Sequence, residues 1–296
     1  MTRISRLTAR AAAHTLTQLS NSRPSMLSKN CFTLPFYLPR ICRTLNNWPE
    51  YLFNYVSRVS RPAEYRLRNG ARLIDETGAL PGTMAVVFVR REYGPLKRFR
   101  TIVDIGAHRG TFAVHAAHAS PEAKVYCYEP EQRNFTFLQQ NIDANGLGSR
   151  VSAFRCAVGA SKGARKLAVG TSLLNSFHII PEDACSQTVN CTTVNEIFAR
   201  HQLDAIDLLK MNCEGAEYEI LESCSRADFD RIANIRLEYH NLNAPNSGES
   251  LSGFLATRGY KLERFTRYLN KSGFIWVTRA TLLALWPEAF AISFGY

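Results

Sequence analysis

Two glycines and two acids in the first half of the sequence form a pattern that suits a cofactor carrying a ribose. Gly106 and Gly110 stand in a turn directly after the apolar run that contains Asp104. Glycine lets the backbone approach a ligand and adopt a positive φ. Glu129 ends the next apolar run, and a carboxylate there accepts hydrogen bonds from ribose hydroxyls. This pair of features fits either NAD or S-adenosylmethionine (SAM).

The spacing of the glycines separates these two cofactors. The turn reads Asp104-x-Gly106-x-x-x-Gly110 and lacks the GxGxxG of dinucleotide enzymes. NAD needs that tight turn so that a helix N-terminus can hold its pyrophosphate. SAM has no phosphate, and the charge of Asp104 suits its methionine ammonium group, directly or through water. The pattern therefore favours SAM.

A second set of polar residues gathers beyond another apolar run. Lys210, Asn212 and Glu214 cluster there, which favours a site over a solvated charge. His240 stands at the end of a later strand-like run. Histidine is a common general base because its ordinary pKa lies near neutrality. These four residues are our catalytic candidates.

The remaining ionisable residues give weaker signals. Glu217 and Glu219 are expected on an exposed helix face. His115 and His118 are three residues apart, but no cysteine or carboxylate completes a ligand set with them and His108. No metal site is predicted, and the role of His108 stays open.

The elements that must position these residues alternate between strand and helix from residue 101 onward. This alternation predicts a mostly parallel sheet with helices on both faces. Ligands of such sheets bind at the carboxyl ends of the strands, near the point where strand order reverses. We predict strands at 101–105, 124–128, 151–154, 205–211 and 232–239, helices at 111–119 and 131–145, and a closing hairpin of 260–265 and 273–278.

The region before residue 99 is organised differently. Residues 66–98 read as short strands and turns, including the apolar run Met84–Val89. Residues 31–58 mix aromatic and basic side chains, as in a helix that lies on a membrane surface or on the core, and we favour the core. Residues 1–30 are rich in arginine and serine and contain no acid. That composition fits an organelle transit peptide, a disordered leader, or a chain whose natural start is Met26.

Composition and charge bound the class of protein. The 296 residues are 46% apolar, which is ordinary for a globular protein. The first 100 residues carry 17 Lys and Arg against 5 Asp and Glu, whereas the remainder carries 19 against 20. A basic arm followed by a nearly neutral body argues against a nucleic-acid-binding body. Eight cysteines without a CxxC pair favour a reducing, cytoplasmic location, with an organelle as the alternative. No apolar run reaches the roughly 18 residues of a transmembrane helix.

Four ordered motifs resemble one known family. They read VDIGAHRG at 103–110, YEP at 128–130, NIDANG at 141–146 and LLKMNCEGAE at 208–217. These motifs are similar to the VDIGANxG, EP, NxxxNG and LLKxDxEGxE of the FkbM family of SAM-dependent methyltransferases. The resemblance covers about residues 64–279.

The resemblance implies a fold, a reaction and a set of site residues. The fold is the class I methyltransferase fold, a Rossmann-like α/β structure whose seven-stranded, mostly parallel sheet has one antiparallel strand. The reaction is methylation of hydroxyl groups on sugars, polyketides and related metabolites. The residues implied for cofactor binding are Asp104, Gly106, Ala107, Gly110, Glu129, Asn134, Ala157 and Val158. Those implied for the methyl-transfer site are Lys210, Asn212, Glu214 and Gly215, with Glu238 and His240 matching the family's E-x-H.

Two positions depart from the family pattern. Asn212 replaces the acid of KxDxEG, and Asn195 replaces the acid of a TLD segment. Both changes remove a negative charge and keep a hydrogen-bonding shape. They motivate one alternative hypothesis, a methyltransferase-like module without catalysis.

We predict an O-methyltransferase that uses in-line methyl transfer, with His240 as the first candidate base and Glu214 as the second. The alternative enzyme is an RNA or protein methyltransferase that uses the basic arm. The predicted partner is a small-molecule or glycan hydroxyl acceptor; nucleic acid is not favoured, and peripheral membrane contact stays open. Residues 31–98, 171–188 and 241–250 would form the acceptor-binding site and so determine which acceptor is bound. The predicted domains are a flexible basic leader (1–45), an N-terminal helix and strand subdomain packed on the core (46–98), the SAM-binding domain (99–280) and an apolar tail (281–296).

Overall fold

The computed structural model describes residues 27–57, 61–168, 186–241, 246–268 and 272–280. The chain divides into two compact units, residues 1–43 and 44–296. In the first unit, the described residues form helix α2 (Leu27–Thr44), which lies inside the range predicted as a leader. Residues 1–26 and the predicted apolar tail, 281–296, lie outside the described part of the chain.

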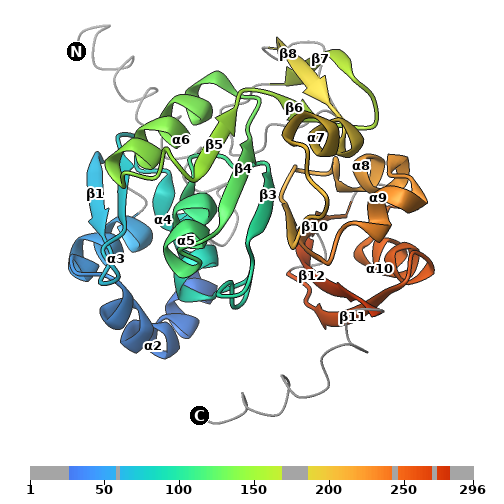
Figure 1. Cartoon of the computed structure of the whole chain (residues 1–296). Helices are drawn as coiled ribbons and strands as arrows, with labels where there is room; N and C mark the ends of the chain where they lie inside the picture. Colours follow the sequence, from blue (N-terminus) through green and yellow to red (C-terminus); the bar gives the residue numbers. More distant parts are fainter. Residues whose placement is uncertain (1–26, 58–60, 169–185, 242–245, 269–271, 281–296) are drawn as a thin grey trace, which may run out of the picture. The chain divides into compact units, whose positions relative to one another are not determined.

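A seven-stranded sheet forms the centre of the second unit (Figure 1). Its order is β11-β12-β10-β9-β3-β4-β5, and β12 runs antiparallel to both of its neighbours while the other pairs are parallel. The predicted fold class, with one antiparallel strand, is confirmed. The strands are β3 (Thr101–Ile105), β4 (Lys124–Tyr128), β5 (Val151–Phe154), β9 (Leu208–Met211), β10 (Asn234–His240), β11 (Tyr260–Phe265) and β12 (Ser272–Arg279).

The strand order reverses between β3 and β9. The chain runs from β3 outward to β4 and β5, then returns to place β9 and β10 on the other side of β3. Both central strands are almost completely buried and apolar except for Thr101, Asp104 and Lys210. The carboxyl ends of β3 and β9 therefore mark the switch point at which a ligand is expected in such a sheet.

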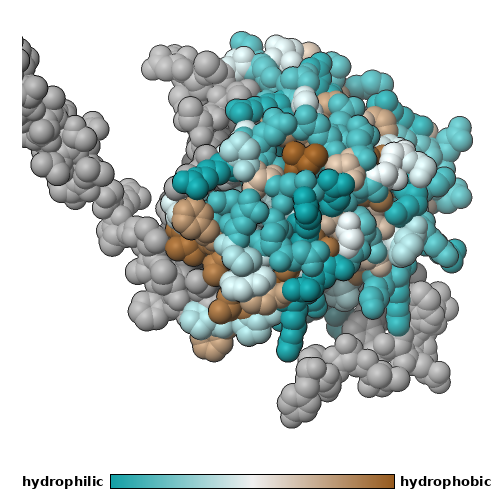
Figure 2. All heavy atoms as spheres, turned by 90° about the vertical axis from the view of Figure 1, so that its left-hand side faces the viewer, coloured by the Kyte–Doolittle hydropathy of each residue, from teal (hydrophilic) through white to brown (hydrophobic). Residues whose placement is uncertain are grey.

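Helices flank the sheet on its two halves. Figure 1 shows α5 and α6 beside β3–β5, and α8, α9 and α10 beside β10–β12. The face in Figure 2 is mainly hydrophilic, with apolar side chains in small separate groups, as is ordinary for a protein surface. The helices are α5 (Thr111–Ala119), α6 (Gln132–Ala144), α7 (Val194–His201), α8 (Glu217–Ser223), α9 (Arg226–Asp230) and α10 (Gly248–Thr257).

The region before β3 corrects one prediction. Helix α3 (Trp48–Ser57) precedes a hairpin of β1 (Ala63–Arg66) and β2 (Arg72–Asp75). The run Met84–Val89, predicted as extended, is helical instead: α4 (Leu80–Met84) continues into a π-helix, η1 (Ala85–Val89). A continuous apolar run does not distinguish a buried strand from a buried helix. Pro81 at the start of α4 favours the helix, because proline fits the first helical turn.

A second, three-stranded sheet was not predicted. It has the order β6-β8-β7 and comprises β6 (Ala157–Val158), β7 (Gly163–Ala168) and β8 (Ser186–Thr192). Most of the 171–188 segment lies outside the described residues, and residues 186–188 begin β8. In the 241–250 segment, residues 242–245 are outside them as well, and residues 248–250 belong to α10. Among the described helices, none is long and apolar enough to cross a membrane.

Candidate active site

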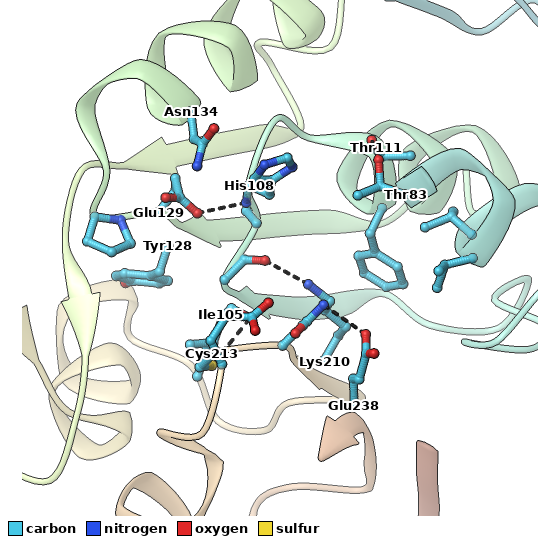
Figure 3. A pocket seen from close by; sticks show the side chains of 18 of the residues that line it. Thr83, Ile105, His108, Thr111, Tyr128, Glu129, Asn134, Lys210, Cys213 and Glu238 are labelled. Atoms are coloured by element: carbon cyan, nitrogen blue, oxygen red, sulfur yellow. Dashed lines mark hydrogen bonds between the residues drawn. The ribbon is translucent and has the colours of Figure 1, made fainter. Parts of the chain in front are cut away.

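A cavity of about 490 Å³ opens at the carboxyl ends of the central strands (Figure 3). The ends of β3, β4 and β9 contribute to its wall, as do β6, His240 at the end of β10, and the helical segment α4–η1. Its size lies in the range of ordinary small-molecule sites. The cavity therefore coincides with the switch point of the sheet.

One side of the cavity holds a buried carboxylate with well-defined partners. Glu129 follows β4, and its Oε2 accepts a hydrogen bond of 2.8 Å from the backbone N–H of His108. Its Oε1 accepts one of 3.0 Å from the N–H of Glu131. Burial raises the pKa of Glu129 to about 7, although these hydrogen bonds favour the charged form. Asn134 lies beside it, held by helix α6, whose first turn is capped by Glu131.

The two predicted glycines have different tasks. Gly106 lines the cavity with a φ of +74°, and a Cβ there would collide with the carbonyl oxygen of Asn212. Gly110 also has a positive φ, but a Cβ there would press on Leu138 of α6. Gly110 does not line the cavity, so its small size serves the packing of α5 on α6. Ala107 lines the cavity as predicted for a cofactor turn.

Asp104 and Lys210 form a buried ion pair beneath the cavity. They stand opposite each other in the register of β3 and β9, and Lys210 Nζ lies 2.7 Å from Asp104 Oδ1. Lys210 Nζ also donates a 2.9 Å hydrogen bond to the carbonyl oxygen of Gly106. Burial raises the pKa of Asp104, and the charge of Lys210 opposes this shift. Lys210 lines the cavity and Asp104 does not. The sequence predicted that Asp104 would face the ammonium group of SAM, but the side chain exposed to the cavity at this point is that of Lys210.

The other side of the cavity brings together the predicted catalytic residues. Asn212 Nδ2 donates a 3.0 Å hydrogen bond to Glu238 Oε2. His240 Nε2 lies 3.4 Å from Glu214 Oε2, and His240 Nδ1 lies 3.4 Å from Glu217 Oε1. Asn212, Glu214, Glu238 and His240 all line the cavity.

Glu217 corrects a second prediction. It was expected on an exposed helix face, but it is completely buried. Its two carboxylate oxygens accept hydrogen bonds from the backbone N–H groups of Cys213 (2.6 Å) and Gly215 (2.9 Å). The carboxylate therefore turns back over the loop before α8 and fixes it. Glu219 is partly buried and pairs with Arg165 at 2.6 Å.

The charges in this cluster shift each other's pKa. Burial raises the pKa of Glu214 to about 7, opposed by the charge of His240. For His240, burial disfavours the charged form, but the hydrogen bond to Glu217 and the charges of Glu217, Glu214 and Glu238 raise its pKa to about 9. At neutral pH the imidazole is thus protonated, and Glu214 is close to its midpoint.

Three cavity residues were not assigned by sequence reasoning. His108 lines the cavity with a φ of +51°, and its Nδ1 has no hydrogen-bond partner among the described residues. Burial lowers its pKa to about 3, so its ring stays neutral. Thr83 and Thr111 also line the cavity, with their hydroxyl oxygens 3.3 Å apart. His108 stood inside a motif and could have been found, whereas nothing in the sequence marks Thr83.

Of the other predicted residues, some line the cavity and some do not. Ala157 and Val158 line the cavity from β6. Asn195 lies at the start of α7 and donates a 3.3 Å hydrogen bond to Asp228 Oδ1 in α9, so it does not reach the cavity. Within the described part of the chain, no three His, Cys, Asp or Glu side chains are grouped to hold a metal ion.

These residues fit SAM as the bound cofactor. A buried carboxylate beside Asn134 suits ribose hydroxyls, and Ala157 with Val158 offers an apolar surface for adenine. The close approach of Gly106 to Asn212, just after β9, requires a residue without a side chain at this point of the turn. Asn212 and Glu214 line the same cavity as the residues of this turn.

Comparison with known proteins gives the same assignment. A family model described as "Methyltransferase FkbM domain" matches residues 104–262, more than half of the chain. The chain is similar to "Methyltransferase sdnD" of Sordaria araneosa, with 24% identity over 46% of this chain and 65% of that protein. It is also similar to "31-O-demethyl-FK506 methyltransferase FkbM" of Streptomyces tacrolimicus, with 22% identity over 48% of this chain and 66% of that protein. Both matches span just under two thirds of the relative's length.

A solved structure carries the same family name. "Methyltransferase FkbM from Methylobacillus flagellatus KT" is 15% identical, with a TM-score of 0.45 over 85% of this chain and 60% of that one. The family model, the four motifs and the cavity at the switch point agree on the cofactor and on the class of reaction. The chain belongs to the FkbM family of methyltransferases, and its cofactor is S-adenosylmethionine.

Proposed function

We propose that the protein methylates a hydroxyl group of a sugar, polyketide or related metabolite. The observation that carries this proposal is the Glu214–His240 pair, which lines the same cavity as Glu129. A carboxylate with a pKa of about 7 is poised to accept the proton that a hydroxyl must lose. The printed name of the Streptomyces relative, which describes O-methylation, supports the same chemistry.

The cofactor half of the cavity would hold SAM in one orientation. Glu129 would accept hydrogen bonds from the ribose hydroxyls, and Asn134 would contact the same sugar. Ala157 and Val158 flank the adenine. Gly106, Ala107 and His108, which line the cavity, would border the methionine portion. When bound, SAM supplies a methyl group already activated by a sulfonium. The chain itself must therefore align the acceptor and remove its proton.

Glu214 replaces His240 as the proposed base. With a pKa of about 9, His240 carries a proton at neutral pH and has no free lone pair for a second one. Its charge instead favours the ionised form of Glu214, 3.4 Å away. As the oxygen of the acceptor gains the methyl group, its proton passes to the Glu214 carboxylate. Glu217 holds His240 from the opposite ring nitrogen, at 3.4 Å.

Asn212 would orient the acceptor rather than take a proton. Its amide donates to Glu238, and its Oδ1 has no hydrogen-bond partner among the described residues. That oxygen is free to accept a hydrogen bond from an acceptor hydroxyl. An aspartate at this position would place a third carboxylate against Glu214 and Glu238. The amide is therefore compatible with catalysis here. Lys210 holds the Gly106 carbonyl through a hydrogen bond. It thereby fixes the turn that lies between the residues proposed for the cofactor and those proposed for the acceptor.

The apolar part of the wall would keep water from the reacting atoms. Val86 and Val87 of η1 line the cavity together with Tyr93 and Phe112, which are all but fully buried. Excluding water strengthens the electrostatic contacts of the site. The combination of an apolar wall and a few hydrogen-bonding groups suits a neutral, hydroxyl-bearing metabolite.

The test begins with calorimetric titration of the protein with S-adenosylhomocysteine (SAH), the demethylated cofactor. Transfer of a labelled methyl group from SAM is then followed over a panel of hydroxylated sugars and polyketides, with RNA and protein as further acceptors. Transfer to a hydroxyl supports the proposal. Transfer only to RNA or protein contradicts it in favour of the alternative enzyme. SAH binding without any transfer favours the non-catalytic module.

A further inference from the structure

Residues 72–95, which we call the strap, form one wall of the cavity without belonging to the main sheet. The strap begins with β2 and contains α4 and η1. Ala79, Gly82, Thr83 and Val86 are among its cavity-lining residues. Nothing in the site described above explains what holds this wall in place. Its position determines the width of the cavity, so its attachments bear directly on binding.

The two asparagines of the NxxxNG motif hold the first part of the strap. Asn141 Oδ1 accepts a 2.7 Å hydrogen bond from the N–H of Ile74, and its Nδ2 faces the carbonyl oxygen of the same residue. Asn145 makes the matching pair with Arg72, at 2.8 and 2.7 Å. Residues four apart on a helix are displaced by about 6 Å along its axis, and residues two apart on a strand by about 7 Å. The two amides thus pair with β2 as a neighbouring strand would.

The last part of the strap is fastened to the opposite half of the sheet. Buried Glu92 accepts a 2.7 Å hydrogen bond from Arg264, and its carbonyl oxygen accepts one of 2.7 Å from the indole N–H of Trp276. Arg236 donates to the carbonyl oxygen of Pro95 at 2.8 Å. These partners lie on β10, β11 and β12. The strap therefore joins helix α6 to strands β10, β11 and β12.

Asp75, at the end of β2, organises the turn into α4. It is completely buried. Its Oδ1 accepts hydrogen bonds from the N–H groups of Thr77 (3.2 Å) and Ala79 (3.1 Å). Its Oδ2 accepts one of 2.9 Å from the N–H of Leu80. A carboxylate at a helix start satisfies amides that lack partners within the helix. The direction in which α4 leaves β2 is thus set by Asp75.

Arg109 connects this turn to the cofactor site. It follows His108 in the glycine turn, and its side chain is only 8% exposed. Its Nη1 lies 3.5 Å from Asp75 Oδ1 and also donates to the hydroxyl of Thr77. Its Nε donates to Asn134 Oδ1 at 3.3 Å, and its guanidinium stacks 4.6 Å from the ring centre of Phe137. One planar group thereby holds a cavity residue and the start of the strap together.

We propose that Arg109 is a positioning residue that couples SAM binding to the placement of the strap. It does not line the cavity, yet it fixes Asn134 on the cofactor side and Asp75 at the base of α4. Binding of SAM at Asn134 stabilises the Arg109 geometry, and that geometry stabilises the α4–η1 wall. Coupling of this kind is reciprocal, so loosening the wall weakens SAM binding. The coupling rests on the proposed contact of Asn134 with the cofactor, whereas the attachment of the strap does not.

The primary test is Arg109→Lys, which keeps the charge opposite Asp75. A lysine ammonium is a single point donor and does not reach Asp75 and Asn134 at the same time, unlike the guanidinium fork. We expect SAH to bind about tenfold more weakly, within the 5- to 150-fold range usual for coupled sites. We also expect backbone amide hydrogens of α4 and η1 to exchange at least several-fold faster. Arg133→Lys is the matched control, because Arg133 also faces the ring of Phe137, at 6.0 Å, but is exposed.

A measurement on the unaltered protein tests the reciprocal effect. SAH should slow hydrogen exchange in α4–η1 as well as around Glu129. Protection around Glu129 alone would overturn the coupling, as would an Arg109→Lys variant that is folded and binds SAH within twofold of the unaltered protein. If Arg109→Lys does not fold, SAH affinity and hydrogen exchange are measured instead on Asp75→Asn, which removes the charge of the residue that Arg109 pairs with. If the unaltered protein does not bind SAH, the proposed cofactor contacts fail, while faster exchange in α4–η1 of the variant still supports the attachment.

Discussion

The two halves of the cavity treat their carboxylates differently. In the cofactor half, both oxygens of Glu129 accept hydrogen bonds from backbone N–H groups, at 2.8 and 3.0 Å. In what we call the acceptor half, formed by Asn212, Glu214, Glu238 and His240, Glu214 faces the side chain of His240, and Asn212 pairs with Glu238. Backbone donors are fixed by the fold and do not titrate. The charge of a titrating side-chain partner such as His240 instead favours the ionised form of the carboxylate beside it.

This difference separates binding from reaction. Both Glu129 and Glu214 have a pKa raised to about 7 by burial, so their pKa values alone do not distinguish them. Their partners do. Glu129 is held by backbone N–H groups, which suits its proposed role in binding the ribose, whereas Glu214 lies 3.4 Å from His240, whose positive charge favours the ionised form of Glu214. Variants of the two glutamates should therefore fail in different ways.

The largest expected effect comes from Glu214→Gln. Glutamine keeps the shape and cannot take a proton, so the turnover of a hydroxylated acceptor should fall by about 10²- to 10⁴-fold. SAH affinity, measured by calorimetry, should stay within twofold because Glu214 belongs to the acceptor half. Turnover close to that of the unaltered protein would contradict the assignment of Glu214 as the base. Loss of SAH binding would contradict the separation of the two halves.

Glu129→Gln should have the next largest effect, and on binding. A hydrogen bond to a charged group contributes about 1.5–3 kcal/mol, which corresponds to a roughly 10- to 150-fold loss of SAH affinity. Turnover at saturating SAM should change much less. The exposed Glu122→Gln is the control for removing one negative charge. Equal SAH affinity in the Glu129 and Glu122 variants would remove Glu129 from the cofactor site.

The pH dependence of turnover distinguishes the two candidate bases. If Glu214 takes the proton, turnover at saturating substrates rises about tenfold per pH unit below 7 and levels off above it, because the carboxylate is then ionised. If His240 were the base, the rise would continue to about pH 9, where the imidazolium loses its proton. The two groups interact, so the profile reports apparent values of the pair. His240→Gln should move the midpoint upward, since it removes the positive charge that favours ionised Glu214.

Much of the fold could be predicted because its signals are local. The turn from Gly106 to Gly110, the apolar runs of the central strands and the acid at Glu129 each lie within a few residues. The alternation of strand and helix then gives the parallel sheet and places the site at its carboxyl edge. The same signals brought Asn212, Glu214 and His240 to one cavity, as the structure shows.

What the sequence did not reveal depends on pairings between distant residues. Asp104 and Lys210 were both selected, but only the register of β3 and β9 makes them an ion pair. Glu217 has the sequence setting of a surface helix residue, and its burial follows from the loop it caps. The β6–β8–β7 sheet was missed because β6 has only two residues, and neither β7 nor β8 contains the continuous apolar run that marked the central strands.

The smallest expected effect is that of Asn195→Asp, which restores the family's acid outside both halves of the cavity. Asn195 donates to Asp228, which also caps the start of α9 through Ser225. An aspartate would replace this hydrogen bond with two like charges, and the free energy of unfolding should fall by about 1 kcal/mol. SAH affinity and turnover should not change, since Asn195 does not line the cavity. Thr188→Asp on β8 is the control for adding one negative charge to the surface. A gain in turnover with Asn195→Asp would show that the lost acid belongs to the reaction, and that the active site extends beyond the two halves compared above.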